Sequence, residues 1–148
     1  MIEKEIEKWI MEVIAKPNKI FGNLPPCPYA KKAWLDGKVK VIEASFTFDY
    51  DKLKSGELDL IIIVQDGASI DELYDLKYTL ERNLGKEFVI LEDHQEIKEE
   101  VSGFNLNFGK PVLFVQNRNK LKEAREFLKT TDYYKNFEKD YKDDILSN

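Results

Sequence analysis

Apolar residues recur every three or four positions in the first segment of the chain, and Glu and Lys fill most of the positions between them. The apolar positions are Ile2, Ile6, Trp9, Ile10, Val13 and Ile14. This spacing predicts an amphipathic helix that stops at Pro17, because proline does not fit a helix interior. Residues 28–35 then have the composition of a short helix closed by Gly37. Pro28 suits its first position, which predicts Cys27 as the N-cap.

Two strands with different patterns are predicted next. Apolar and polar residues alternate over residues 39–48, as in a strand with one exposed face. Residues 58–65 are almost continuously apolar and β-branched, which predicts a strand in the middle of a sheet covered on both faces. The polar segment 50–57 between them is typical of a turn that joins antiparallel neighbours.

A capping box marks the start of the next helix. Ser69 is followed three residues later by Glu72, and leucines at helical spacing continue from there to Gly85. Because the Ser and Glu side chains satisfy backbone N–H groups of the first turn, this pattern predicts a helix that begins at Ser69. Gly85 is expected to end it.

The last part of the chain contains two more predicted strands and a helical end. The strands cover residues 86–92 and 111–116, and the loop 95–110 between them is long enough to suggest a functional role. From Asn119 onward, two apolar stripes at helical spacing predict C-terminal amphipathic helices. The stripes are Leu121, Ala124, Phe127 and Leu128, then Tyr134, Phe137, Tyr141 and Ile145.

This order of elements predicts an α+β fold. We expect an antiparallel sheet with helices packed on one face, together with amphipathic helices at both ends of the chain. The order over residues 28–116 matches a ferredoxin-like sandwich whose first strand has been moved to the end. A chain of 148 residues fits one domain, so a single α+β domain over residues 1–148 is expected.

The composition limits the function classes. The formal net charge of -5 argues against a nucleic-acid partner, because phosphate binding draws on clustered Lys and Arg. A single cysteine permits no internal disulfide and no multi-thiolate zinc site, which favours a reducing, cytoplasmic setting. The charged N-terminus and the short apolar runs indicate neither export nor a membrane partner.

Cys27 is the first candidate for chemistry. A thiol at a helix N-terminus faces unpaired backbone N–H groups and the positive end of the helix dipole, and both stabilise a thiolate or a bound anion. Lys31, one turn further on, would add to this effect. A structural role is the alternative, since free cysteine is among the most buried residue types.

His94, the only histidine, is the second candidate. It follows a predicted strand at the point where the chain leaves the sheet, next to Glu92 and Asp93. A Cys27–His94 couple would supply a nucleophile and a base, or would hold a metal ion together with a carboxylate. The alternative is a solvated histidine in an acidic turn.

Further residues are candidates for binding a ligand or cofactor of unknown identity. They are Asn23, Tyr29, Lys31 and Asn107, which belong to the turn around Cys27 and to the amide-rich segment 103–111. Turn formation and helix capping by Asn account for several of them without any ligand.

The tyrosines and phenylalanines near the C-terminus admit two explanations. An aromatic stripe at helical spacing is usually a packing face, here against the sheet or the first helix. The same stripe would also suit a homo-oligomer contact or a protein partner if it were exposed.

Two resemblances bear on the segment around Cys27. The order of W-I-M-E-V-I, N-L-P-P-C-P-Y-A, G-K-V-K-V-I and D-E-L-Y-D-L resembles an uncharacterised family of small bacterial proteins that carry N-L-C-P-F-A after a first helix and a histidine after a later strand. This resemblance implies that Cys27, Pro28 and Ala30 belong to a recurring feature, and it implies no activity. C-P-Y-A also resembles the C-P-Y-C of glutaredoxins, with Ala30 in place of the second cysteine.

Three hypotheses follow from the sequence. The first is a protein with a ligand, metal or thiolate site around Cys27, with or without His94. The second is a non-catalytic binding or accessory module that acts through an interface. The third is a thiol-redox protein of the glutaredoxin type, and the sequence leaves open whether the protein is an enzyme.

Overall fold

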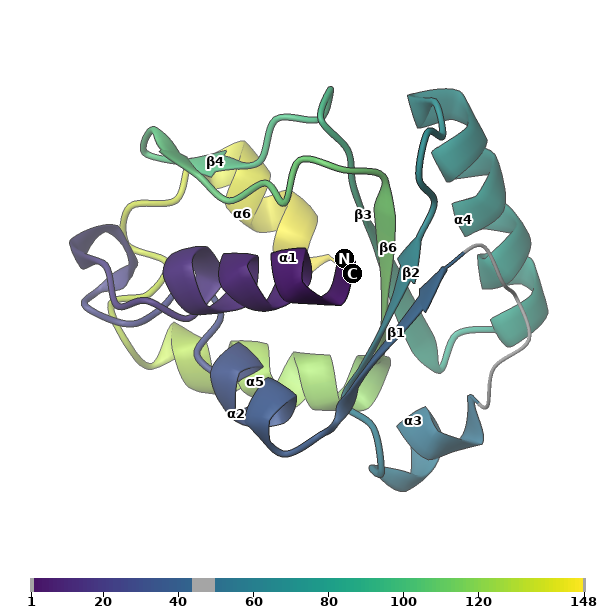
Figure 1. Ribbon diagram of the computed structural model, residues 1–148. Coiled ribbons are helices and arrows are strands. Elements are labelled where there is room, and N and C mark those ends of the chain that lie inside the picture. Colours follow the sequence, from purple (N-terminus) through teal and green to yellow (C-terminus); the bar gives the residue numbers. More distant parts are fainter. Residues whose placement is uncertain (1, 44–49, 148) are drawn as a thin grey trace.

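A four-stranded sheet stands between two groups of helices in the computed structural model, which describes residues 2–43 and 50–147 (Figure 1). The strands are β1 (Val39–Glu43), β2 (Leu60–Val64), β3 (Phe88–Asp93) and β6 (Val112–Asn117). Their order in the sheet is β1-β2-β6-β3. β1 and β2 are parallel, whereas β6 runs antiparallel to both β2 and β3. The predicted α+β class is confirmed, with a mixed sheet.

One face of the sheet is covered by α3 (Asp51–Ser55) and α4 (Ile70–Leu84). The predicted capping box at Ser69 is present, and α4 ends before Gly85 as expected. The leucines of α4 pack on alternate residues of the strands in a tightly buried cluster. Its buried members are Leu53, Ile61, Ile63, Leu73, Leu80, Phe88, Ile90, Leu113 and Val115.

The other face is covered by helices from both ends of the chain. These are α1 (Ile2–Trp9), the π-helix η1 (Ile10–Ile14), α2 (Ala30–Leu35), α5 (Arg118–Lys129) and α6 (Lys139–Leu146). In Figure 1 they lie on the side of the sheet opposite α3 and α4. Ile6 and Ile10 pack there on Ile62, Val64 and Val112. We expected helices on one face together with amphipathic helices at both ends of the chain, and in the structure these terminal helices cover the second face.

The predicted antiparallel turn between the first two strands is wrong. The connection contains α3, and the single apolar residue of that helix, Leu53, is fully buried under the sheet. A parallel pair needs a crossover of about a dozen residues or more, and the segment 44–59 provides it. Because β1 and β2 are parallel, the sheet differs from the ferredoxin-like arrangement that we expected. Residues 44–48 of the predicted first strand lie outside the described part of the chain.

A third cluster forms beside the sheet and contains the aromatic residues near the C-terminus. It joins the 3-10 helix η2 (Lys19–Phe21) and the hairpin of β4 (Glu100–Val101) and β5 (Phe104–Asn105) to α5 and α6. Phe21, Tyr133, Tyr134 and Phe137 contact one another with ring centroids 4.8–5.7 Å apart. The stripe is therefore a packing face. Within residues 2–43 and 50–147, no helix has the length and apolarity that a membrane span requires.

Gly22 fixes the loop after the first helix against the segment that follows α5. Its φ is +67°, and an added Cβ would lie 2.8 Å from the backbone carbonyl carbon of Asp132. Gly37 has a similar φ of +70°, but an added Cβ would meet nothing within 4 Å. The two glycines thus share a backbone conformation and differ in the space around them.

We expect Gly22→Ala to destabilise the protein more than Gly37→Ala does. Both substitutions force alanine into a left-handed conformation, at about 1 kcal/mol. Gly22→Ala adds an overlap with backbone that cannot rotate away, worth roughly 1–3 kcal/mol more. Urea unfolding of both variants measures the difference, and equal losses of unfolding free energy would contradict this account of the loop.

Candidate functional site

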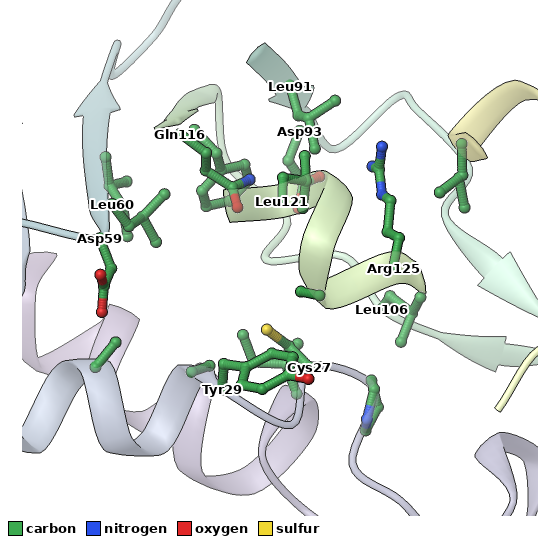
Figure 2. Close-up of a pocket in the computed structure, with 18 of the residues that line it drawn as sticks. Cys27, Tyr29, Asp59, Leu60, Leu91, Asp93, Leu106, Gln116, Leu121 and Arg125 are labelled. Atoms are coloured by element: carbon green, nitrogen blue, oxygen red, sulfur yellow. The ribbon is translucent and has the colours of Figure 1, made fainter. Parts of the chain in front are cut away.

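A cavity of about 820 Å³ lies between the second face of the sheet and the helices that cover it. Figure 2 shows side chains from the strands, from α5 and from the loop around Cys27 pointing into it. Volumes of this order are typical of sites for small organic molecules. The cavity is therefore the natural place to examine the predicted residues.

The strand register determines the floor of the cavity. Phe114 of the central strand β6 lies between Ile62 and Leu91, and Gln116 lies between Leu60 and Val89. Phe114, Gln116, Leu60 and Leu91 are only half-buried, although they belong to the sheet. The helices above them do not fill the space, so these side chains border a void.

Small residues and a helical irregularity form the opposite wall. Ala30, Ala33 and Ala124 line the cavity from α2 and α5, where larger side chains would occupy it. In η1, the N–H of Ala15 bonds to the carbonyl of Ile10 across five residues. The carbonyl of Ile14 accepts the N–H of Cys27 at 2.7 Å, and this bond anchors the Cys27 loop to η1.

Cys27 lines the cavity, but it is not the N-cap of α2. The helix begins at Ala30, and Tyr29 takes the N-cap position. The chain makes a turn through Pro28 first, and the thiol still accepts hydrogen bonds from the N–H groups of Tyr29 and Ala30. Burial raises the pKa of the Cys27 thiol and outweighs these two bonds, which act to lower it. The geometry therefore holds a neutral thiol.

His94 does not line this cavity, and both nitrogens of its ring bond to backbone groups. The residue is 1% exposed. Its Nδ1 accepts the N–H of Glu96 at 3.1 Å, so Nε2 carries the proton and donates to the carbonyl of Ala68 at 3.0 Å. The two hydrogen bonds of the ring thus connect the segment after β3 to the loop before α4. The structure does not bring Cys27 and His94 into one site.

The other predicted ligand-binding residues are dispersed. Tyr29 lines the cavity and is 45% exposed, whereas Asn23 lies in the turn after η2 with a φ of +66°. Lys31 is exposed on α2. The Asn107 amide donates to Asp93 and to the carbonyls of His94 and Ile97, and it accepts the N–H of Glu99. Asn107 therefore shapes the loop 95–110 rather than the cavity.

Asp93 is a buried carboxyl at the edge of the cavity, where its side chain is 4% exposed. One oxygen accepts the N–H of Phe108 at 2.7 Å, and the other accepts the amide of Asn107 at 3.2 Å. Burial, with a smaller effect from Glu99, raises the pKa of Asp93 to about 6. These bonds attach the loop 95–110 to the end of β3.

Two further contacts hold the same loop over the cavity. The indole N–H of Trp9 donates to the carbonyl of Leu106 at 3.0 Å, and the Tyr141 hydroxyl donates to Glu99 at 2.7 Å. Burial raises the pKa of the Glu99 carboxyl, although its bond with Tyr141 acts to lower it. Leu106, Glu99 and Tyr141 all line the cavity.

Arg125 and Gln116 are polar residues of the cavity, and Arg125 was not predicted. Arg125 is 9% exposed on α5, and Figure 2 shows its guanidinium pointing from the helix into the cavity. Its position is four residues after Leu121 and three before Leu128, within the apolar stripe of that helix. Gln116 likewise ends an apolar strand. In both cases the sequence signal of a cavity residue was a polar side chain at a position where the pattern is otherwise apolar.

Within the described residues, no three His, Cys, Asp or Glu side chains lie close enough together to hold a metal ion. Comparison with models of known protein families, with curated proteins and with solved structures gives no significant match. Inference about function therefore depends on the cavity and its residues.

We expect Cys27 to react slowly with iodoacetamide at pH 7, because a raised pKa leaves less thiolate than in the unfolded chain. Each unit of pKa lowers the thiolate fraction about tenfold at neutral pH. Alkylation rates measured from pH 6 to pH 10, on the folded protein and in urea, give the pKa of the Cys27 thiol in the folded and the unfolded state. A pKa that is lower in the folded protein than in urea would contradict the neutral thiol.

We expect the free energy of unfolding of the native protein to fall relative to that of Asp93→Asn as the pH rises. The folded pKa of about 6 exceeds the unfolded value of 3.8, so the stabilisation by the protonated carboxyl is complete below pH 3.8 and is lost as the pH passes 6. Between pH 4 and pH 7 the difference should change by about 2 kcal/mol. Urea unfolding at several pH values measures it, and a difference that grows with pH would refute the buried state of Asp93.

Proposed function

We propose that the protein binds a small organic molecule in the cavity between the sheet and the helices of its second face. The observation that carries this proposal is the partly open pocket of about 820 Å³, lined mostly by apolar surface with charged and amide groups among it. Concave, mostly apolar pockets of this size are the usual sites for small organic molecules. A space of this size over the central strands is best explained by an occupant.

The lining supports an organic ligand with an apolar body. Ile62, Phe114 and Leu91 provide a flat apolar floor, and Ile10 and Ile14 face it from η1. Burying a ligand against such surfaces contributes roughly 25 cal/mol per Å² of apolar area removed from water. A few polar groups then determine the orientation.

Binding is better supported than thiolate catalysis. The thiol of Cys27 is kept neutral by burial, and His94 is committed to Ala68 and Glu96. We therefore assign Cys27 a contact role in the cavity. The resemblance of its segment to N-L-C-P-F-A proteins fits this role and contributes no activity. We also propose a cytoplasmic location, because the only cysteine is a free thiol.

The neutral dye prodan, whose emission moves to the blue in apolar surroundings, is a suitable probe for the cavity. We expect it to bind the native protein with a blue shift and to slow the alkylation of Cys27. Ala124→Trp, which places an indole in the cavity, should weaken dye binding at least tenfold. Lys122→Trp, at an exposed position of the same helix, is the matched control and should leave binding unchanged.

Each variant is first checked for a native circular dichroism spectrum and a cooperative unfolding transition. Prodan that binds equally well to the native protein and to folded Ala124→Trp would mean that the cavity is not the site. Absence of any dye binding and of any protection of Cys27 would overturn the proposed function. Cys27→Ser should still bind the dye, since the sulfur is a contact and not a nucleophile.

A further inference from the structure

We propose that the ligand is an uncharged molecule that carries an N–H donor beside a carbonyl acceptor, and that the side-chain amide of Gln116 pairs with this edge. A cyclic amide is the simplest group of this kind. This inference rests on the proposed function and specifies the chemical class of the ligand. It follows from one amide on the floor of the cavity whose hydrogen-bonding groups the fold leaves unused.

Gln116 places its amide on a central strand, among apolar neighbours. It lies opposite Leu60 in the pairing of β2 with β6, and both residues line the cavity. Figure 2 shows the Gln116 side chain among those that point into the cavity. The residue is half-buried, so the amide is partly withdrawn from water. A ligand on the floor can therefore reach it.

The Gln116 amide has no partner in the fold. Among the buried and half-buried polar side chains of the described lining, it is the one that makes no hydrogen bond or ion pair. An amide withdrawn from water without a hydrogen bond is unfavourable, and a bond to a ligand removes this cost. The amide presents its acceptor and its donors in one plane, so a cyclic amide can form two hydrogen bonds with it.

Other polar side chains that line the cavity already interact within the fold. Lys77 is 2.7 Å from Glu92, and Lys120 is 3.5 Å from Asp59. Arg125 also has an interaction within the protein. A charged group on the ligand would compete with these existing partners, whereas a group that pairs with Gln116 displaces none.

The charges of the lining also favour an uncharged ligand. An anion would be repelled, because carboxyls outnumber cations among the described lining residues. A cation would compete with the bonds that hold the loop 95–110, since Asp93 accepts the N–H of Phe108 and Glu99 accepts the hydroxyl of Tyr141. The lining carboxyls are Asp59, Glu92, Asp93, Glu99, Glu123 and Asp144, and the cations are Lys77, Lys120 and Arg125.

Aromatic rings beside the amide favour a flat ligand. Trp9 stacks on Phe114 with the ring centroids 5.8 Å apart and 23° between the ring planes, and both residues line the cavity. Phe114 lies two residues before Gln116 on β6, so the two side chains share one face of the sheet. A flat ligand can contact the aromatic rings while its edge meets the amide.

Four probes of similar size test the hydrogen-bonding edge and the charge separately. They are 2-quinolinone, which carries the N–H and the carbonyl side by side, quinoline, which carries an acceptor only, 2-naphthoate and 2-naphthalenemethylamine. Each is titrated calorimetrically into the native protein at pH 7.5. We expect 2-quinolinone to bind about tenfold or more tightly than quinoline, because it gains additional hydrogen bonds to the amide. Both charged probes should bind more weakly than 2-quinolinone.

Substitutions of Gln116 test whether this residue reads the edge. In Gln116→Met, which keeps the length of the side chain and removes the amide, 2-quinolinone should lose its advantage over quinoline. Gln95→Met makes the same change at an exposed position and is the matched control. Gln116→Glu presents two acceptors, so it should prefer protonated 2-aminoquinoline, whose two N–H donors match a carboxylate, over 2-quinolinone. The native protein should have the opposite preference, and this exchange still decides if Gln116→Met does not fold.

The outcomes separate the two proposals. If prodan binds but 2-quinolinone is no tighter than quinoline, or keeps its advantage in folded Gln116→Met, the cyclic-amide inference is overturned and the proposed function stands. Tightest binding by naphthoate or by the naphthyl amine, or dye binding with no binding by any of the four probes, overturns the inference in the same way. If neither prodan nor any probe binds, the proposed function itself fails.

Discussion

The apolar character of β2 on both of its faces is the constraint on which the rest of the structure depends. Ile61 and Ile63 point to one side of the sheet, and Ile62 and Val64 point to the other, so water must be excluded from both sides. The crossover through α3 and the leucines of α4 cover one side. The other side must be covered by helices from the two ends of the chain. Most of these helices are connected to one another by loops.

This division explains why the two sides are packed differently. α4 has fifteen residues with leucines at regular spacing, and it can lie along the strands over its whole length. α2 has six residues and presents alanines to the sheet, and α1 continues into a π-helix. Short helices with small side chains leave space above Phe114 and Gln116. The cavity is thus a consequence of how the second face is covered, and the loop 95–110 closes over it through Asp93 and Trp9.

The sequence predicted those features that depend on local patterns. The capping box at Ser69, the β-branched run of β2 and the first amphipathic helix at each end were found because spacing alone specifies them. Tyr134 and Phe137 of the second C-terminal stripe lie instead in turns before α6. The parallel pairing of β1 and β2 was missed, since Leu53 is one apolar residue in a polar segment. Its burial depends on a core that only the folded chain assembles. Arg125 escaped notice for a related reason, because which polar residues face inward depends on how the layers meet.

Two opposing effects act on the pKa of the Cys27 thiol, and burial is the larger of them. The N–H groups of Tyr29 and Ala30 do reach its sulfur, as expected of a thiol near a helix start, and they favour the thiolate. The same loop is anchored to η1 and held by the bond from the Tyr133 hydroxyl to the Pro26 carbonyl, which keeps Cys27 at the wall of the cavity. Removing a thiolate from water costs more than these two amide bonds return, so the neutral form prevails. A thiol held in this state fits the wall of a binding cavity better than it fits a nucleophile.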